Sequence, residues 1–356
     1  MLSAARLHRY LGWGLGLWLT LLCLSGALLL YKNSLLRLSY PALAAVTPVS
    51  DIQQWGPLLQ QLQQDANFRY VKFPDADAHW LEAVTFDNQR YYYDGNRQLL
   101  LTRPVHADWL DWVYDFHLHL LGGKTGHTVN GVIGLLSVVL LLCGLWLWWP
   151  RRFSLRLFTL PKAQTSLRSL RQYHSLLALL LLPLLLLTSA TGAMMVFSQQ
   201  TRTVLSAVLG QDQHPNTPVS GIAPVALELT DWPRALATAT AHWPAQQLRL
   251  VSFRRNAQDV ISFRAKAEDE WHPNGRGVLQ LHPASYQLMY ARAAADLSPA
   301  DKVRNSFYPL HVASIGGVLY KILLLISGVS CLLLFALGLS YSWQRLKARS
   351  ARYDVC

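Results

Sequence analysis

The sequence predicts a membrane α-helical protein in which four transmembrane helices form two span–outer domain–span repeats, with a small α+β domain in each of two long outer loops. The first supporting observation is composition: 52% of the 356 residues are hydrophobic and 15% are charged, against about 25% charged in a typical soluble domain. The second is four long apolar stretches, and the third is a repeated spacing of histidines and glycines within and beside them. A mean hydropathy of +0.18 is too low for a chain lying wholly in lipid, so polar domains accompany the spans.

Each apolar stretch lacks internal charge and is about as long as a helix needs to cross the hydrocarbon core, roughly 20 residues. We expect the first stretch to be a retained span and not a signal peptide. Its apolar run exceeds the usual h-region of about 7–15 residues, and no A-x-A cleavage site follows it directly. The four predicted spans cover residues 11–31, 128–149, 175–197 and 322–340.

The distribution of charge predicts the topology. The two tails and the loop over residues 150–173 carry 12 of the 32 Lys and Arg residues and one acid, whereas the two long loops carry 19 basic and 19 acidic residues. By the positive-inside rule, we expect both termini and the short loop to be cytoplasmic and both long loops to lie outside. Because topology accounts for the net charge of +12, we expect no nucleic-acid binding.

Each long loop predicts a helix followed by a β-meander. In the first loop, residues 51–62 have helical apolar spacing, and Asp94-Gly95 marks a hairpin turn. In the second loop, residues 224–242 predict the helix, and a turn begins at His282-Pro283. The predicted strands cover residues 68–73, 81–86, 90–93, 98–102, 247–253, 260–265, 277–281 and 287–292.

The predicted order alternates between membrane and periplasm. It runs as tail and first span (1–31), first outer domain (32–115), outer segment and second span (116–149), basic loop (150–173), third span (174–197), second outer domain (198–307), outer segment and fourth span (308–341) and cytoplasmic tail (342–356).

Histidines and glycines repeat at matched spacings in the membrane part. His8 precedes Gly26 by 18 residues, and His174 precedes Gly192 by 18 residues, about 27 Å of helix. The other two spans reverse this order, with a histidine at the outer end and a glycine near the inner end. These residues are His119 with Gly144 and His311 with Gly338. Each membrane face therefore receives two histidines from one pair of helices and two glycines from the other.

Paired imidazoles on facing helices are typical of haem ligation, and glycine lets a flat macrocycle approach a helix backbone. Because the chain has no CxxCH motif, we expect haem b, with one haem in each leaflet. For the outer site we favour His119, which matches the repeat, over His117 and His127. A zinc site formed by these three histidines lacks a carboxylate or cysteine at a typical ligand spacing. Of the four cysteines, Cys23, Cys143 and Cys331 lie in spans and Cys356 ends the chain, so no disulfide framework is expected in the outer loops.

These residues resemble the PepSY-associated transmembrane helix proteins, and the outer hairpins resemble PepSY units. The resemblance covers nearly the whole chain; His127 departs from it. It is carried by Leu7-His8-Arg9-Tyr10-Leu11-Gly12, Ser25-Gly26-Ala27, Leu118-His119-x-Leu121-Gly122-Gly123, and Leu310-His311 with Gly316-Gly317.

The resemblance implies a bacterial inner-membrane ferric-siderophore reductase with two b-type haems. It implies haem binding by His8, His119, His174 and His311, and reduction of Fe(III) to Fe(II) in the periplasm. With no nucleotide-binding glycine motif in the chain, a flavoprotein or a quinol is the expected electron donor. The alternatives are a non-enzymatic PepSY-type protein that binds a periplasmic partner or regulates a protease, and an iron-chelate permease. The spans offer a permease few polar side chains.

Overall fold

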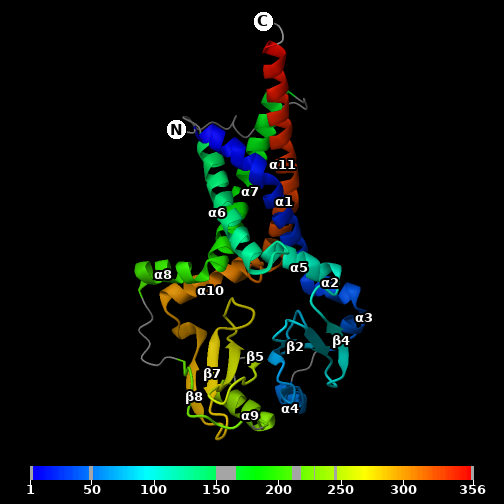
Figure 1. Cartoon of the computed structure of the whole chain (residues 1–356), viewed down its shortest axis with the longest axis vertical. Coiled ribbons are helices and arrows are strands. Elements are labelled where there is room, and N and C mark those ends of the chain that lie inside the picture. Colours follow the sequence, from blue (N-terminus) through cyan, green and yellow to red (C-terminus); the bar gives the residue numbers. More distant parts are fainter. Residues whose placement is uncertain are drawn as a thin grey trace. The chain divides into compact units, whose positions relative to one another are not determined.

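The computed structural model describes residues 3–47, 51–149, 166–210, 218–227, 229–243 and 247–353. Most of the predicted basic loop, residues 150–165, lies outside the described residues, as does Cys356. The chain divides into two compact units (Figure 1). We call Met1–Leu30, Val113–Thr201 and Leu310–Cys356 the membrane unit, and Tyr31–Trp112 with Arg202–Pro309 the sheet unit.

The membrane unit is built from four long helices, α1 (Ala4–Leu29), α6 (Gly123–Trp148), α7 (Leu167–Val196) and α11 (Gly317–Tyr353). Each is long and apolar enough to cross a membrane, which confirms the four predicted spans. Helix α1 contacts α6 and α11, and α7 contacts the same two helices. Helices α1 and α7 therefore lie diagonally opposite each other, as do α6 and α11.

Small residues bring these helices close together, as is common in membrane bundles. A Cβ at Gly16 would lie 2.5 Å from the Phe335 ring, and one at Gly328 would lie 2.8 Å from the carbonyl oxygen of Cys23. Large apolar side chains such as Leu180, which is 74% exposed, face outward. Such a surface suits contact with lipid tails.

Two shorter helices lead into the second and fourth spans. Helix α5 (Trp109–His119) precedes α6, and α10 (Pro299–His311) precedes α11. The turn before α11 has φ of +74° at Gly316 and +65° at Gly317, a conformation that glycine adopts without strain. The turns at the two Gly-Gly pairs thus separate α5 from α6 and α10 from α11.

The sheet unit contains one antiparallel sheet of eight strands in the order β4-β3-β2-β1-β5-β6-β7-β8. All eight predicted strands are confirmed to within about two residues at each end. Their bounds are β1 (Phe68–Lys72), β2 (Leu81–Thr85), β3 (Arg90–Tyr93), β4 (Leu99–Arg103), β5 (Gln247–Ser252), β6 (Ile261–Lys266), β7 (Gly277–Leu281) and β8 (Leu288–Arg292).

The two predicted outer domains are one compact unit, which corrects the prediction of two separate domains. Strand β1 pairs with β5, with Val71 opposite Val251. Each four-stranded meander alone would leave an unpaired edge strand and a small core. Joining the meanders at these edges satisfies the backbone groups and merges the two cores.

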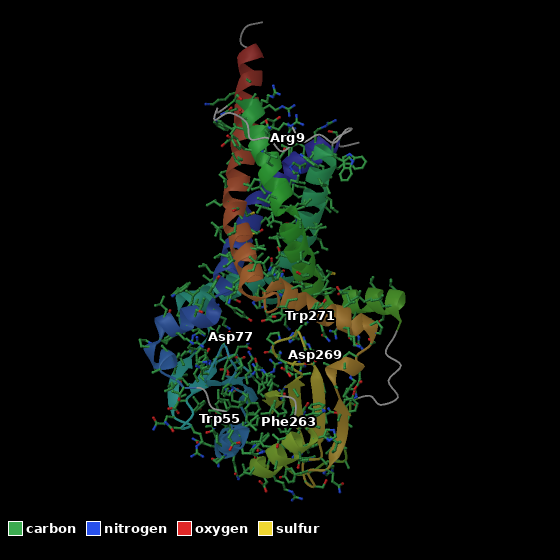
Figure 2. All side chains as sticks on the ribbon, turned by 180° about the vertical axis from the view of Figure 1, so that it is seen from behind. Arg9, Trp55, Asp77, Phe263, Asp269 and Trp271 are labelled. Carbon is green, nitrogen blue, oxygen red and sulfur yellow. The ribbon has the colours of Figure 1, made fainter. Side chains whose placement is uncertain are left out.

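One face of the sheet carries the shared core. The 3-10 helix η1 (Ile52–Trp55), α4 (Gly56–Gln63) and α9 (Trp232–His242) contribute to it. Trp55 is 1% exposed and Phe263 is fully buried there (Figure 2). Helix α9 begins later than the predicted residue 224, because the Asp231 side chain caps it by accepting a hydrogen bond from the Arg234 N–H.

The remaining helices were not predicted: α2 (Lys32–Ser39), α3 (Pro41–Ala44), η3 (Ala294–Asp296) and α8 (Ser198–Leu209). Tyr40, the residue between α2 and α3, is linked to Arg103 of β4 through a shared carboxylate. Arg103 donates to Asp108 at 2.8 Å, and the hydroxyl of Tyr40 donates to the same carboxylate at 2.6 Å.

Candidate functional site

Two pairs of histidines meet inside the membrane unit. The first pair joins His8 on α1 to His174 on the diagonally opposite helix α7, with ring centroids 6.4 Å apart. The Nδ1 atom of His8 lies 3.1 Å from the Leu140 carbonyl oxygen, and that of His174 lies 3.1 Å from the Leu334 carbonyl oxygen. Because a carbonyl can only accept, each Nδ1 carries the hydrogen, and each Nε2 keeps its lone pair.

Glycines lie directly against both imidazole rings of the first pair. A Cβ at Gly144 would lie 3.0 Å from the Cε1 atom of His8, and one at Gly338 would lie 3.1 Å from the Cε1 atom of His174. The accepting carbonyl belongs in each case to the residue four positions before the glycine, on the same helix face. A larger residue at either position would press against the imidazole.

The second pair repeats this arrangement with His117 of α5 and His311 of α10, whose ring centroids are 6.1 Å apart. A Cβ at Gly26 would lie 3.0 Å from the Cε1 atom of His117, and one at Gly192 would lie 3.1 Å from that of His311. The Nδ1 atom of His311 lies 3.1 Å from the carbonyl oxygen of Thr188, four residues before its glycine.

Hydroxyl groups distinguish the second pair from the first. The Nδ1 atom of His117 lies 3.0 Å from Ser25 Oγ, and that of His311 lies 3.1 Å from Thr191 Oγ1. The Ser25 hydroxyl donates to the Leu22 carbonyl at 3.0 Å, and the Thr191 hydroxyl donates to its own helix at 2.7 Å. Each hydroxyl therefore accepts a hydrogen bond from the imidazole.

The structure does not place His119 opposite His311, where we expected it. His119 pairs with Asp115 at 2.7 Å and its side chain is 34% exposed, while its ring lies 5.3 Å from that of His127. Residues two apart on a helix point to different sides, so His117 and His119 cannot both face His311.

A spacing in the sequence distinguishes these two candidates. His117 precedes Gly144 by 27 residues, and His311 precedes Gly338 by the same 27 residues. His119 precedes Gly144 by 25 residues. The shared Leu-His dipeptide favoured His119, but the distance to the glycine identifies the histidine that reaches the bundle centre.

Zinc does not suit these histidines as the structure places them. Among the described residues there is no group of three or more His, Cys, Asp or Glu side chains positioned to hold a metal ion. The second pair instead offers two imidazoles.

Burial keeps the second pair neutral. Burial, reinforced by the neighbouring His311, lowers the pKa of His117 to about 4. Burial also lowers the pKa of His311. Both rings are therefore uncharged near pH 7, which is the form of imidazole that ligates metals.

Both pairs would suit a haem iron, which accepts imidazole ligands. Ring centroids about 6 Å apart leave room for one metal ion between two imidazoles, whose nitrogens bind metals at about 2.0 Å. The observed distances are 6.4 and 6.1 Å. None of the four Nε2 atoms has a hydrogen-bond partner among the described residues.

Comparison with known proteins identifies the family of the chain. A search of curated proteins found no match to the chain. The family described as the PepSY-associated TM region matches residues 5–345, which include both histidine pairs, all of α6 and α7, and most of α1 and α11. The chain therefore belongs to the PepSY-associated transmembrane family.

Proposed function

We propose that the protein is a transmembrane oxidoreductase that binds one b-type haem at each histidine pair and passes electrons across the membrane to a ferric siderophore. The observation that carries this proposal is the presence of two imidazole pairs with the same construction. The ring centroids of each pair lie about 6 Å apart, and each imidazole has its Nδ1 hydrogen engaged and its Nε2 available to hold a haem iron.

The residues around each pair have definite roles in this proposal. Hydrogen bonds from Nδ1 fix the orientation of each ring and raise its basicity toward a metal. Gly26, Gly144, Gly192 and Gly338 leave room for the rings beside the helix backbones. A haem bound at either pair would supply one-electron chemistry.

The two pairs lie near opposite ends of the four long helices. On α1, His8 belongs to the first pair and Gly26 contacts the second, 18 residues away, which corresponds to about 27 Å of helix. Two sites therefore divide the path through the apolar bundle. With the termini cytoplasmic, electrons from a flavoprotein or quinol would enter at the first pair.

The expected substrate follows from iron chemistry. Hydroxamate and catecholate oxygens are hard ligands that hold Fe(III) tightly. One-electron reduction gives Fe(II), which these ligands hold less tightly, so it can leave the chelate. Reduction on the periplasmic side would release iron for uptake.

Spectroscopy of the purified full-length protein tests the haem sites. We expect a Soret band, sharp α and β bands on reduction with dithionite, and about two haems per chain. The double variant His8→Ala/His174→Ala should retain about one haem, as should His117→Ala/His311→Ala. His119→Ala is the matched control and should retain both. A colourless protein that takes up no haem would contradict the proposal and favour a PepSY-type interaction protein or a permease.

A second measurement tests the substrate. Anaerobic addition of a ferric siderophore to the dithionite-reduced protein, freed of excess dithionite, should reverse the spectral change. Ferrozine should trap one Fe(II) for each electron delivered. A haem-containing protein that stays reduced in the presence of ferric siderophores would support the haem sites but exclude these substrates.

A further inference from the structure

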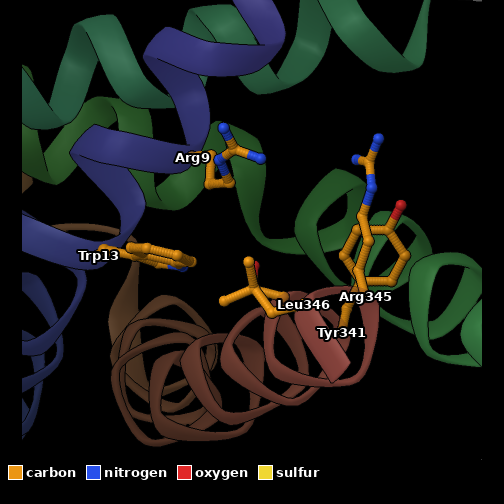
Figure 3. Close-up of a pocket in the computed structure, with 6 residues that line it drawn as sticks. Arg9, Trp13, Tyr341, Arg345 and Leu346 are labelled. Atoms are coloured by element: carbon orange, nitrogen blue, oxygen red, sulfur yellow. The ribbon is translucent and has the colours of Figure 1, made fainter. Parts of the chain in front are cut away.

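A small pocket lies between α1 and α11, close in sequence to the first histidine pair (Figure 3). It holds about 20 Å³, which suits one small polar group and not a whole molecule. Its lining combines two guanidinium groups, two hydroxyl groups and two apolar side chains. These residues are Arg9, Trp13, Tyr341, Ser342, Arg345 and Leu346.

The four long helices supply no carboxylate for these arginines. Helices α1, α6, α7 and α11 contain no Asp or Glu within their bounds. The Nε atom of Arg9 is buried and has no hydrogen-bond partner among the described residues. Its guanidinium lies 5.3 Å from the Tyr10 ring centroid and 6.0 Å from that of Trp13. A buried donor without an acceptor is costly, so an external anion would stabilise this arrangement.

Both helices that line the pocket also carry a residue of the first histidine site. Arg9 directly follows His8 on α1. On α11, Tyr341 and Arg345 lie three and seven residues after Gly338, a spacing that places all three on one helix face. Gly338 itself contacts the ring of His174. The pocket therefore begins within one helical turn of His8 on α1 and of Gly338 on α11.

We propose that Arg9 and Arg345 form a binding site for an anionic oxygen group, and that Tyr341 and Ser342 supply further hydrogen bonds. Arginine suits this chemistry because its planar fork matches carboxylate and phosphate oxygens. Two sources carry such a group here: a propionate carboxylate of a haem at the first pair, and the phosphate of a membrane phospholipid. The first source rests on the proposed function; the second does not.

The first experimental arm tests the haem carboxylate. Arg9→Gln and Arg345→Gln should each increase the rate at which one haem transfers to apomyoglobin, by about tenfold to a hundredfold. The haem affected should be the one at the first pair, which is identified as the haem absent from His8→Ala/His174→Ala. The release of the other haem should not change. The midpoint potential of the haem at the first pair should shift downward, because a nearby positive charge favours the reduced form. Lys347→Gln is the control: it removes the same charge from the same end of α11, where Lys347 lies 5.5 Å from the Trp343 ring centroid and does not line the pocket.

Reconstitution with haem dimethyl ester provides a second test of the haem carboxylate contact. The ester lacks the propionate charges, so the wild type and Arg9→Gln/Arg345→Gln should bind it equally well. Natural haem should distinguish the two proteins. This interaction between ligand and substitution separates a carboxylate contact from a general loss of stability.

The second arm tests the phospholipid. Native mass spectrometry of the wild type and the double variant, each reconstituted in phosphatidylglycerol nanodiscs, counts the phospholipids retained on release. Fewer retained lipids in the variant, with unchanged haem release, would identify a lipid phosphate as the anion. Unchanged haem release and unchanged lipid retention would overturn the proposed site. If the protein binds no haem at all, the proposed function fails, while the lipid arm still tests the pocket.

Discussion

At the scale of single residues, one contact pattern recurs at all four histidines. Each Cε1 atom lies against a glycine. The Nδ1 atoms of His8, His174 and His311 lie near the carbonyl group four residues before that glycine, and the Nδ1 atom of His117 reaches the Leu22 carbonyl through the Ser25 hydroxyl. The glycine lets the ring come close to the helix backbone. The ring can then reach a carbonyl group on the same helix face as the glycine. Ring position and tautomer are thus set by the same turn of helix.

Gly144→Ala should therefore disrupt the first pair. The new Cβ would lie 3.0 Å from the Cε1 atom of His8, so the ring must move, and a haem there should be lost or bound less tightly. Haem per chain, measured as the pyridine haemochrome, should fall from about two toward one. Gly14→Ala is the control, because a Cβ at that position meets nothing within 4 Å. Full haem content with an unchanged spectrum in Gly144→Ala would show that the close approach is unimportant.

Thr191→Val tests the hydroxyl groups of the second pair. The substitution keeps the side-chain shape but removes the acceptor 3.1 Å from the Nδ1 atom of His311. A weaker hydrogen bond to Nδ1 makes the imidazole a poorer donor to iron, so the potential of one haem should rise. A redox titration measures this shift.

Thr188→Val is the matched control for Thr191→Val. The Thr188 hydroxyl bonds to its own helix at Leu184, and the backbone carbonyl that contacts His311 remains. An equal rise in both variants would count against a specific role for Thr191.

At the scale of elements, periodicity and length predicted the four spans and eight strands, because each depends on residues close in sequence. The short helices α2, α3 and α8 were missed, since helices of this length depend on packing for stability. The choice of His117 over His119 was missed because it depends on the direction in which α5 ends. The Leu-His dipeptide shared with His311 favoured His119, whereas the 27-residue spacing to Gly144 favours His117.

The loop between β6 and β7 contains a histidine that should make folding sensitive to acid. His272 is 5% exposed and accepts a hydrogen bond from Arg276 at 2.8 Å. Burial, followed by the charges of Arg276 and Arg264, lowers the pKa of His272 to about 3. An unfolded histidine takes up a proton near pH 6.5. The free energy of unfolding should therefore decrease as the pH falls from about 6.5 toward 3, by at most about 1.4 kcal/mol per pH unit from this residue.

Denaturant unfolding at pH 7.5 and pH 5 measures this effect. The loss of stability at pH 5 should be smaller in His272→Gln than in the wild type. His282→Gln is the control, because the ring of His282 lies in a turn in which its Nδ1 contacts only backbone N–H groups. Equal pH dependence in the wild type and His272→Gln would contradict the prediction.

At the scale of the whole molecule, the two halves of the chain depend on each other. Each half supplies two long helices to the membrane unit and four strands to the sheet unit. The sequence predicted separate outer domains because the pairing of β1 with β5 joins residues about 180 positions apart, and no local pattern reports such a contact. Val71 and Val251, opposite each other at this junction, are fully buried.

Val251→Asp should unfold both halves of the sheet unit together. It places an unpaired carboxylate in the shared core, which costs several kcal/mol, on the order of 3–5. Limited proteolysis should then cut in both residues 51–103 and residues 247–292. Val105→Asp is the control, because Val105 is 47% exposed. Cleavage confined to the second half would show that the two meanders fold independently.

Each imidazole rests against a glycine and near a main-chain carbonyl of a neighbouring helix. Sliding or rotation of that helix would carry the ring along with it. The separation of the two imidazoles in a pair is therefore coupled to how tightly the long helices pack.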